Sequence, residues 1–239
     1  MVPALLVLGT STGVGKTAVV GALALSWRHM GQVLTTRKPF AAGSWDDTDM
    51  LRTLGQLEEP RELVTPYYSE QPLVPAPGWA AWDLQTVTDK VAACIGSAAP
   101  QNHVVIVEGI GGVRSPLSER ADFLMVAGRL GLPMLLVSDC ELGTLSTTLL
   151  CLEAATQERV RVLGVVLNRY RADDAVHRHN LGYLRTHAAT PDLVVPLPFV
   201  PAASTARVVA ATSSHLLSDE EGGAERLRML MGLMDRAAR

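Results

Sequence analysis

Six short apolar runs recur along the chain, and longer segments with helical periodicity lie between them. Val, Ile and Leu dominate the runs with little alternation, which is typical of strands buried on both faces of a parallel sheet. The predicted strands are Leu5–Leu8, Val33–Arg37, Val104–Val107, Met134–Val137, Leu163–Leu167 and Leu193–Val195. The predicted helices are Thr17–Met30, Asp47–Gln56, Asp83–Ser97, Ala121–Leu130, Leu145–Glu158, Ala175–His187 and Ala224–Ala237.

This alternation predicts an α/β fold with a doubly wound, mostly parallel sheet flanked by helices. The 239 residues suffice for one such domain, and we expect residues 1–239 to form it without a repeat or a second domain. Pro66–Pro77 is interpreted as an ordered loop and Ser213–Gly223 as a surface loop. Functional residues of doubly wound sheets gather where strands end, so the segments after the strands carry the candidate site.

Composition narrows the class of protein. The formal charge of −3 and the lack of a basic tract argue against nucleic-acid binding. No apolar run approaches the ~20 residues that span a bilayer, and Val2–Leu8 is too short, without a basic flank, for a secretion signal. The widely spaced Cys94, Cys140 and Cys151 predict buried free thiols. We therefore expect a cytoplasmic protein with no nucleic-acid or membrane partner.

The glycine-rich segment Gly9–Thr17 (GTSTGVGKT) lies between the first predicted strand and the first predicted helix. In this setting backbone N–H groups and a helix N-terminus bind polyphosphate. Lys16 is expected to reach the β- and γ-phosphates, and the Thr17 hydroxyl to bind Mg²⁺. The strict pattern has Gly where Thr10 stands, one residue after Gly9. A simple Gly/Ser/Thr turn is the alternative, but the Gly-Lys-Thr ending favours a P-loop NTPase-like nucleotide site.

Charged residues follow the second strand. Lys38 stands at its exit, where an unpaired buried ammonium is expensive, so we expect it near a bound triphosphate. The alternative is a lysine that reaches the surface beside a turn. Three acidic residues come next: Asp46 or Asp47 is expected to cap the following helix, and Asp49 to face the loop and bind a metal.

Glu108 ends the third strand and is followed by glycines that let the backbone approach a ligand, Gly109, Gly111 and Gly112. A carboxylate across from Thr17 has the position of a Mg²⁺ ligand in phosphate-loop enzymes. Mg²⁺ takes one or two protein carboxylates, so Asp49 with Glu108 is sufficient.

The later strands deliver further polar residues. Thr144 and Ser146 either cap the next helix or bind a carboxylate at its N-terminus, and the sequence does not separate the two. Asn168 after the fifth strand suits the edge of a purine, although a turn Asn is the alternative. Three histidines without acidic or Cys neighbours are expected in solvent, namely His177, His179 and His187.

With these residues placed, the chain resembles the dethiobiotin synthetases, the ATP-dependent ligases of biotin synthesis. The likeness runs across most of the chain. In order, it comprises Gly9–Thr17, Lys38-Pro39 with Gly43, Asp49, Pro66-Tyr67 with Pro72 and Pro75, Val107–Gly112 with Pro116-Leu117, Leu142-Gly143-Thr144, Asn168 and Pro196–Pro198.

The resemblance implies an ATP- and Mg²⁺-dependent cyclo-ligase that closes 7,8-diaminononanoate and CO₂ into dethiobiotin, giving ADP and phosphate. The implied catalytic residues are Thr12, Lys16 and Lys38. The implied nucleotide-binding residues are Gly13, Val14, Gly15, Lys16, Thr17, Ala18, Asn168 and Pro198. The implied Mg²⁺ ligands are Thr17, Asp49 and Glu108. The implied substrate-binding residues are Ala42, Gly111, Gly112, Thr144 and Ser146.

The resemblance also implies a homodimer with the substrate at its interface, where Gly143–Ser146 binds the substrate carboxylate from the neighbouring subunit. Three positions depart from the family pattern. Ala42 replaces a common Ser, Ser146-Thr147 replace an Asn-His pair, and Gly13 replaces an acidic residue. A related ATP-dependent ligase with a changed acceptor is therefore one alternative.

A second alternative is a partner-switching ATPase that positions chromosomes or the septum. Such proteins carry a Lys early in the loop, where this chain has Ser11, and often a membrane-binding tail. The apolar residues of the last predicted helix, Leu227, Leu230, Met231 and Met234, follow a spacing more typical of packing on a sheet. A related amidotransferase of corrinoid synthesis is not expected, because no room remains for its glutaminase domain and none of the three cysteines stands in a nucleophile-like turn.

Overall fold

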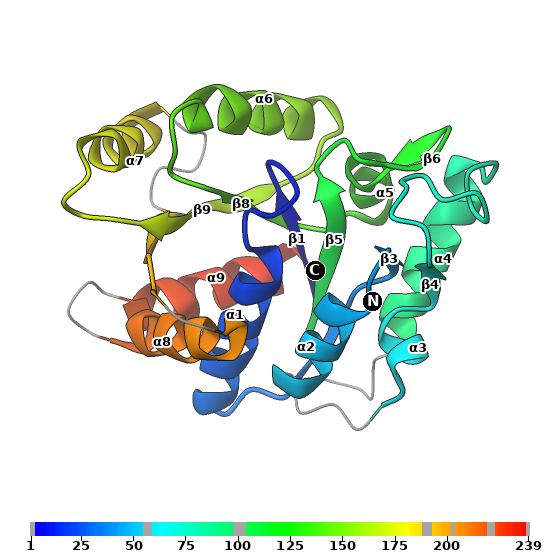
Figure 1. Ribbon diagram of the computed structural model, residues 1–239, viewed down its shortest axis with the longest axis horizontal. Coiled ribbons are helices and arrows are strands. Elements are labelled where there is room, and N and C mark those ends of the chain that lie inside the picture. The colour runs from blue at the N-terminus through cyan, green and yellow to red at the C-terminus, as the bar shows by residue number, and fades with distance from the viewer. Residues whose placement is uncertain are drawn as a thin grey trace.

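A computed structural model describes residues 3–54, 59–97, 104–187, 193–201, 204–218 and 223–237, with the side chains of the last range described for 225–232 (Figure 1). Its centre is a six-stranded sheet in the order β10-β9-β8-β1-β5-β2, in which every neighbouring pair is parallel. The strands are β1 (Ala4–Gly9), β2 (Leu34–Arg37), β5 (Val104–Gly112), β8 (Met134–Ser138), β9 (Val162–Tyr170) and β10 (Val194–Pro198). All six predicted strands are confirmed.

Helices cover both faces of this sheet (Figure 1). One face carries α1 (Lys16–His29), α2 (Asp46–Leu54), α8 (Thr205–Leu217) and α9 (Gly223–Ala237). The other carries α4 (Leu84–Gly96), α5 (Phe123–Leu130), α6 (Thr144–Gln157) and α7 (Ala175–His187). Leu6 and Leu8 of β1 pack into the second layer, and Leu5 and Val7 into the first. Burial on both faces explains why the strands read as continuous apolar runs.

Two small sheets lie beside the main one. β3 (Phe40–Ala42) pairs in parallel with β4 (Tyr67–Ser69), and the short α3 (Arg61–Val64) precedes β4. Because β4 belongs to Pro66–Pro77, that segment is ordered, as predicted, but it begins with a strand. β6 (Pro116–Ser118) and β7 (Ala121–Asp122) form an antiparallel pair.

The prediction of a surface loop at Ser213–Gly223 is wrong at its start, because residues 213–217 form the last turn of α8. Residues 219–222 lie outside the described residues. The sequence pattern did not predict α8. Its buried stripe contains polar residues, and the hydroxyl of Ser213 is 2.9 Å from that of Ser26 on α1.

The apolar face of α9 packs into the protein. Leu227 and Leu230 are buried and Met231 contacts the same cluster, while the side chain of Met234 lies outside the described part. Across the described ranges, no helix is both long and apolar enough to cross a membrane. All three cysteines are buried and free, as predicted.

Candidate active site

The phosphate loop occupies the turn from β1 to α1. Gly15 immediately precedes α1 with a φ of 94°, and a Cβ there would lie 2.2 Å from Nδ2 of Asn168. Only glycine therefore fits this turn without strain. Lys16 Nζ donates to the carbonyl oxygens of Gly111, at 2.7 Å, and of Ser11, at 3.3 Å. Burial lowers the pKa of Lys16, although Glu108 opposes that shift.

Two neighbouring strands bring Lys38 and Glu108 together. Arg37 pairs in register with Val107, so Lys38, directly after β2, lies beside Glu108, which continues in β5 and pairs with Val7 of β1. Lys38 Nζ lies 2.5 Å from Glu108 Oε1 and 2.7 Å from Asp47 Oδ2. Burial opposes the charge of Lys38, but the two carboxylates outweigh it and raise its pKa. Burial also raises the pKa of Asp47, while Lys38 and the Thr17 hydroxyl outweigh that and lower it.

Oxygen atoms suited to a hard cation meet beside this pair. The Thr17 hydroxyl donates to Glu108 Oε1 at 3.0 Å. Glu108 Oε2 is buried and has no hydrogen-bond partner within the described part of the protein. A buried carboxylate oxygen without a partner is destabilising, and a cation would satisfy it. No cluster of three or more His, Cys, Asp or Glu forms a metal site among the described residues, but one or two carboxylates suffice for Mg²⁺.

On α2, Asp47 contacts Lys38 at this site, whereas Asp49, which we expected to face the loop, does not line it. The Asp49 side chain is half exposed, and its Oδ1 lies 3.5 Å from Nη1 of Arg52 on the same helix. The capping role expected of Asp46 or Asp47 is also wrong, because both lie in the first turn of α2. The hydroxyl of Ser44 instead accepts from the backbone N–H of Asp46 at 3.0 Å.

A cavity of about 680 Å³ joins these groups along the edge where the parallel strands end. Most of the predicted site residues line it, namely Thr12, Gly13, Gly15, Lys16, Thr17, Ala18, Lys38, Ala42, Glu108, Gly111, Asn168 and Pro198. The strand order sets Lys38 and Glu108 on one side of the phosphate loop and Asn168 and Pro198 on the other. The cavity therefore extends across the sheet, from the end of β10 to the end of β2.

Besides Asp49, four predicted residues do not line the cavity. Val14 is buried in the core, and its carbonyl oxygen accepts from Asn168 Nδ2 at 2.8 Å. The N–H of Gly112 donates to the Ser115 hydroxyl at 2.7 Å. Thr144 is buried and bonds to Asp139, and Ser146 is exposed on α6. The capping interpretation is wrong for both, because Gly143 precedes α6 without a side-chain cap and the Thr144 hydroxyl donates to Asp139 instead.

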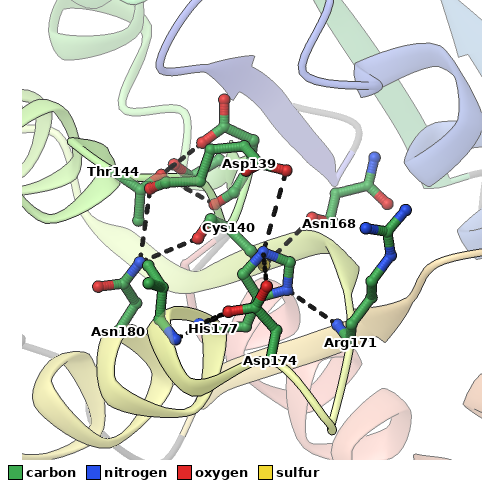
Figure 2. Close-up of polar contacts among 11 residues, drawn as sticks. Asp139, Cys140, Thr144, Asn168, Arg171, Asp174, His177 and Asn180 are labelled. Carbon is green, nitrogen blue, oxygen red and sulfur yellow. Dashed lines mark hydrogen bonds and ion pairs between the residues drawn. The ribbon is translucent and has the colours of Figure 1, made fainter.

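Two residues lie where the sequence did not predict them, and one of the two lines the cavity. Arg169 follows Asn168, lines the cavity and donates from Nη2 to the Gly13 carbonyl oxygen at 2.9 Å. Its only signal in the sequence is its place after a strand. The prediction for His177 is wrong, because it is only 2% exposed and its Nδ1 accepts from the Arg171 N–H at 3.0 Å (Figure 2). His179 and His187 are exposed, as predicted.

Comparison with known proteins shows the family to which the chain belongs. A family described as an AAA domain matches residues 3–215. The ATP-dependent dethiobiotin synthetase of Aromatoleum aromaticum is 35% identical over 213 residues, which cover 85% of this chain and 93% of that protein. The enzyme of the same name from Anaeromyxobacter dehalogenans strain 2CP-C is 36% identical over 174 residues, covering 71% and 78%.

Solved structures give the fold alone. The MinC:MinD cell division protein complex of Aquifex aeolicus has a TM-score of 0.58 at 12% identity and covers 97% of this chain and 95% of that one. pNOB8 ParA bound to nonspecific DNA has a TM-score of 0.58 at 10% identity and covers 99% of each chain. The chain shares its fold with those two proteins, whereas its sequence relatives are dethiobiotin synthetases, which are ligases. By sequence, therefore, the chain belongs to the ATP-dependent dethiobiotin synthetase family of ligases in biotin biosynthesis.

Proposed function

We propose that the protein closes 7,8-diaminononanoate and CO₂ into dethiobiotin, with conversion of ATP to ADP and phosphate. The observation that supports this most is the convergence of two lysines on one cavity. Lys16 comes from the phosphate loop and Lys38 from the end of β2, and both line the cavity with Glu108. Two ammonium groups suit a reaction in which a carbamate anion meets a triphosphate.

In the first step, one substrate amine captures CO₂ as a carbamate and releases a proton. A carbamate oxygen then attacks the γ-phosphorus, the bond to the β-phosphate oxygen breaks, and ADP leaves. The second amine attacks the carbonyl carbon of the resulting carbamic–phosphoric anhydride, closes the ureido ring and expels phosphate. Lys16 and Lys38 would offset negative charge at the transferring phosphoryl group and Thr12 would contact the carbamate. Positioning and charge neutralisation thus do most of the work.

A Mg²⁺ ion fits the oxygen donors beside Lys38. Thr17, Glu108 and, in place of Asp49, Asp47 would hold it, and the unpaired Oε2 of Glu108 supports that assignment. When bound, Mg²⁺ neutralises charge on the β- and γ-phosphates. The Lys38 ammonium forms ion pairs with the carboxylates of Asp47 and Glu108. It would therefore hold both carboxylates in place for the metal while it faces the phosphates.

The nucleotide base would lie between β9 and β10. Asn168 Nδ2 already donates to Val14 within the protein, so its Oδ1 remains to accept from an amino group of the base. Pro198 and Phe199 line the same part of the cavity and offer apolar surface. This arrangement supports adenine recognition by Asn168.

The beginning of α6 would face a second copy of the chain. Leu142, in the turn before α6, is 91% exposed, and Leu150 on α6 is 62% exposed on the same side of the helix as Ser146, four residues earlier. We infer that these exposed apolar residues support a homodimer. The N-terminus of α6 at Gly143 would bind the substrate carboxylate of the partner site. The buried free thiols favour a reducing cytoplasm as its location.

The test supplies 7,8-diaminononanoate, bicarbonate, ATP and Mg²⁺, and follows dethiobiotin and ADP in parallel. The proposal expects both products in equal amounts, and neither in the Lys16→Ala and Lys38→Ala variants. ADP without dethiobiotin would keep the nucleotide site but show a changed acceptor, with Ala42 and Ser146 as the positions to restore. Absence of ADP under all these conditions would contradict the proposal.

A further inference from the structure

Three buried side chains form a series of hydrogen bonds from α7 to the phosphate loop. Figure 2 shows the side chains of Asn180, Cys140 and Asn168. Asn180 Nδ2 donates to the carbonyl oxygen of Cys140 at 2.9 Å. The Cys140 thiol donates to the carbonyl oxygen of Asn168 at 3.2 Å. Asn168 Nδ2 then donates to the carbonyl oxygen of Val14 at 2.8 Å. The three side chains are at most 6% exposed, so water competes little for these bonds.

Asn168 needs such support because the sheet does not hold it. The pairing of β8 with β9 ends at Ser138 and Leu167, one residue before Asn168. On the other side, β9 pairs with β10 at Leu167 and again at Tyr170, with a register shift between them. Asn168 and the following residue therefore form a bulge that lacks regular ladder bonds. Bulges redirect side chains, and contacts outside the ladder decide where this one points.

Cys140 supplies one of those contacts. It lies just beyond β8, and burial raises the pKa of its thiol to about 12. The sulfur therefore keeps its proton and remains a donor at physiological pH. The thiol donates to the backbone carbonyl of Asn168 in the bulge. It therefore supplies a hydrogen bond at the place where the backbone pairing of β8 with β9 has ended.

Helix α7 fixes the segments on both sides of this thiol. Asn180 holds the carbonyl of Cys140. His177 accepts at Nδ1 from the N–H of Arg171, shortly after β9 ends, so the proton of its neutral ring is on Nε2. Asp174 Oδ1 accepts from the N–H of His177 at 3.2 Å and so ties down the start of the helix (Figure 2).

The orientation of the Asn168 amide follows from its partner. The Val14 oxygen accepts hydrogen bonds only, so the NH₂ end of the amide must face it and Oδ1 must face away. An outward oxygen accepts from the amino groups of adenine or cytosine and repels the carbonyl oxygens at the same edge of guanine or uracil.

We propose that Cys140 and Asn180 are positioning residues for base selection, which hold the Asn168 bulge so that its Oδ1 favours nucleoside triphosphates with an amino-bearing base. This inference rests on the proposed role of Asn168 at the base. It adds residues that never touch the nucleotide and act only through the backbone of the bulge.

The test measures binding of ATP and of GTP, each with Mg²⁺, by calorimetry on the full chain, together with KM and kcat for ATP. Cys140→Ala is expected to weaken ATP binding about fivefold, to leave GTP binding nearly unchanged and to raise KM without lowering kcat. Cys140→Ser keeps a donor and should recover most of the loss. Cys151→Ala is the matched control, since Cys151 is also buried and its thiol makes no hydrogen bond within the described ranges.

Two further variants, Asn168→Ala and Asn180→Ala, distinguish failure of the proposed role of Asn168 at the base from failure of the positioning role alone. If Asn168→Ala leaves the preference for ATP over GTP unchanged, the role of Asn168 fails and the inference fails with it. If Asn168→Ala removes the preference but Cys140→Ala and a folded Asn180→Ala keep it, only the positioning role is overturned. An equal loss of ATP and GTP binding in Cys140→Ala would also overturn it, because a merely structural thiol would act on both nucleotides alike.

Discussion

Lys38, directly after β2, forms an ion pair with Glu108 in the middle of the adjacent β5, and their side chains are only 4% and 0% exposed. In such a pair each charge offsets the cost of burying the other, because removal of either partner leaves an unpaired buried charge. The same two groups are the ones that the proposed reaction needs beside the phosphates. The stability of the site and its chemistry are therefore coupled.

The first prediction concerns this coupling. Lys38→Met should lower the free energy of unfolding by about 3 kcal/mol, because Glu108 is left buried without its main partner. The double variant Lys38→Met/Glu108→Gln should lose less than the sum of the two single variants. Urea unfolding without nucleotide measures all three. Additive losses would show that the pair does not act as a unit.

A second prediction separates the two acidic residues of α2. Asp47→Asn should lower kcat about 100-fold and raise the Mg²⁺ concentration needed, because Asp47 contacts Lys38 at the metal site. Asp49→Asn removes the same charge two residues away and should leave both values unchanged. Activity titrated with Mg²⁺ decides between them, and equal effects would contradict the assignment.

A third prediction uses two glycines with positive φ. Gly15 (94°) lies in the phosphate loop, and Gly31 (80°) follows α1 with open space around it. Alanine at either position should cost about 1–2 kcal/mol of stability through its backbone conformation. Only Gly15→Ala should also abolish ATP binding, because its Cβ would collide with Asn168. Retained ATP affinity in that variant would be inconsistent with the geometry of the loop.

The lowered pKa of Lys16 gives a fourth prediction. Its ordinary value is 10.5, and burial lowers it in the folded protein. Between the lowered value and 10.5 the unfolded chain binds more protons, so this lysine makes the free energy of unfolding rise with pH. Lys16→Met should lack that rise. The stability of the wild type relative to the variant should therefore increase from neutral pH towards 10.5, and parallel curves would contradict the shift.

The thiols provide a fifth prediction. Burial raises the pKa of Cys94 and Cys140 to about 12 and that of Cys151 to about 11. A thiolate is the reactive form, so a disulfide reagent at neutral pH should label none of them in the folded protein. All three should react after unfolding in urea. Fast labelling of the native protein would show that one of these cysteines is accessible.

The strands and most of the cavity could be predicted because their signals are local. A buried parallel strand is a continuous apolar run, and the residue after it lies at the functional edge. Lys38, Glu108 and Asn168 were all found in this way, and each lines the cavity. The choice between Asp47 and Asp49 could not be made from spacing, because two residues along a helix differ by about 200° around its axis. A small error in the predicted start or orientation of the helix therefore exchanges which of Asp47 and Asp49 is expected to face the cavity.

Helix α8 and the buried His177 escaped for a common reason. Each belongs to a stripe at helical spacing in which polar side chains occupy buried positions. In α8 these are Thr212 and Ser213, and in α7 they are His177 and Asn180. Their partners lie on other elements, such as Ser26 for Ser213 and Cys140 for Asn180. Hydrogen bonds of this kind are invisible to a pattern of apolar residues.

The strand that delivers Lys38 is the shortest of the six described strands of the main sheet. β2 has four residues, lies at the edge of that sheet and pairs with β5. Heat can therefore release one edge of the sheet while the central strands stay intact, and Lys38 leaves Glu108 when this happens. Catalysis would stop before the bulk of the protein melts. The upper temperature limit of the enzyme is then set by the fraying of a single short strand, and a covering segment over β2 would extend its working range more than a better-packed core.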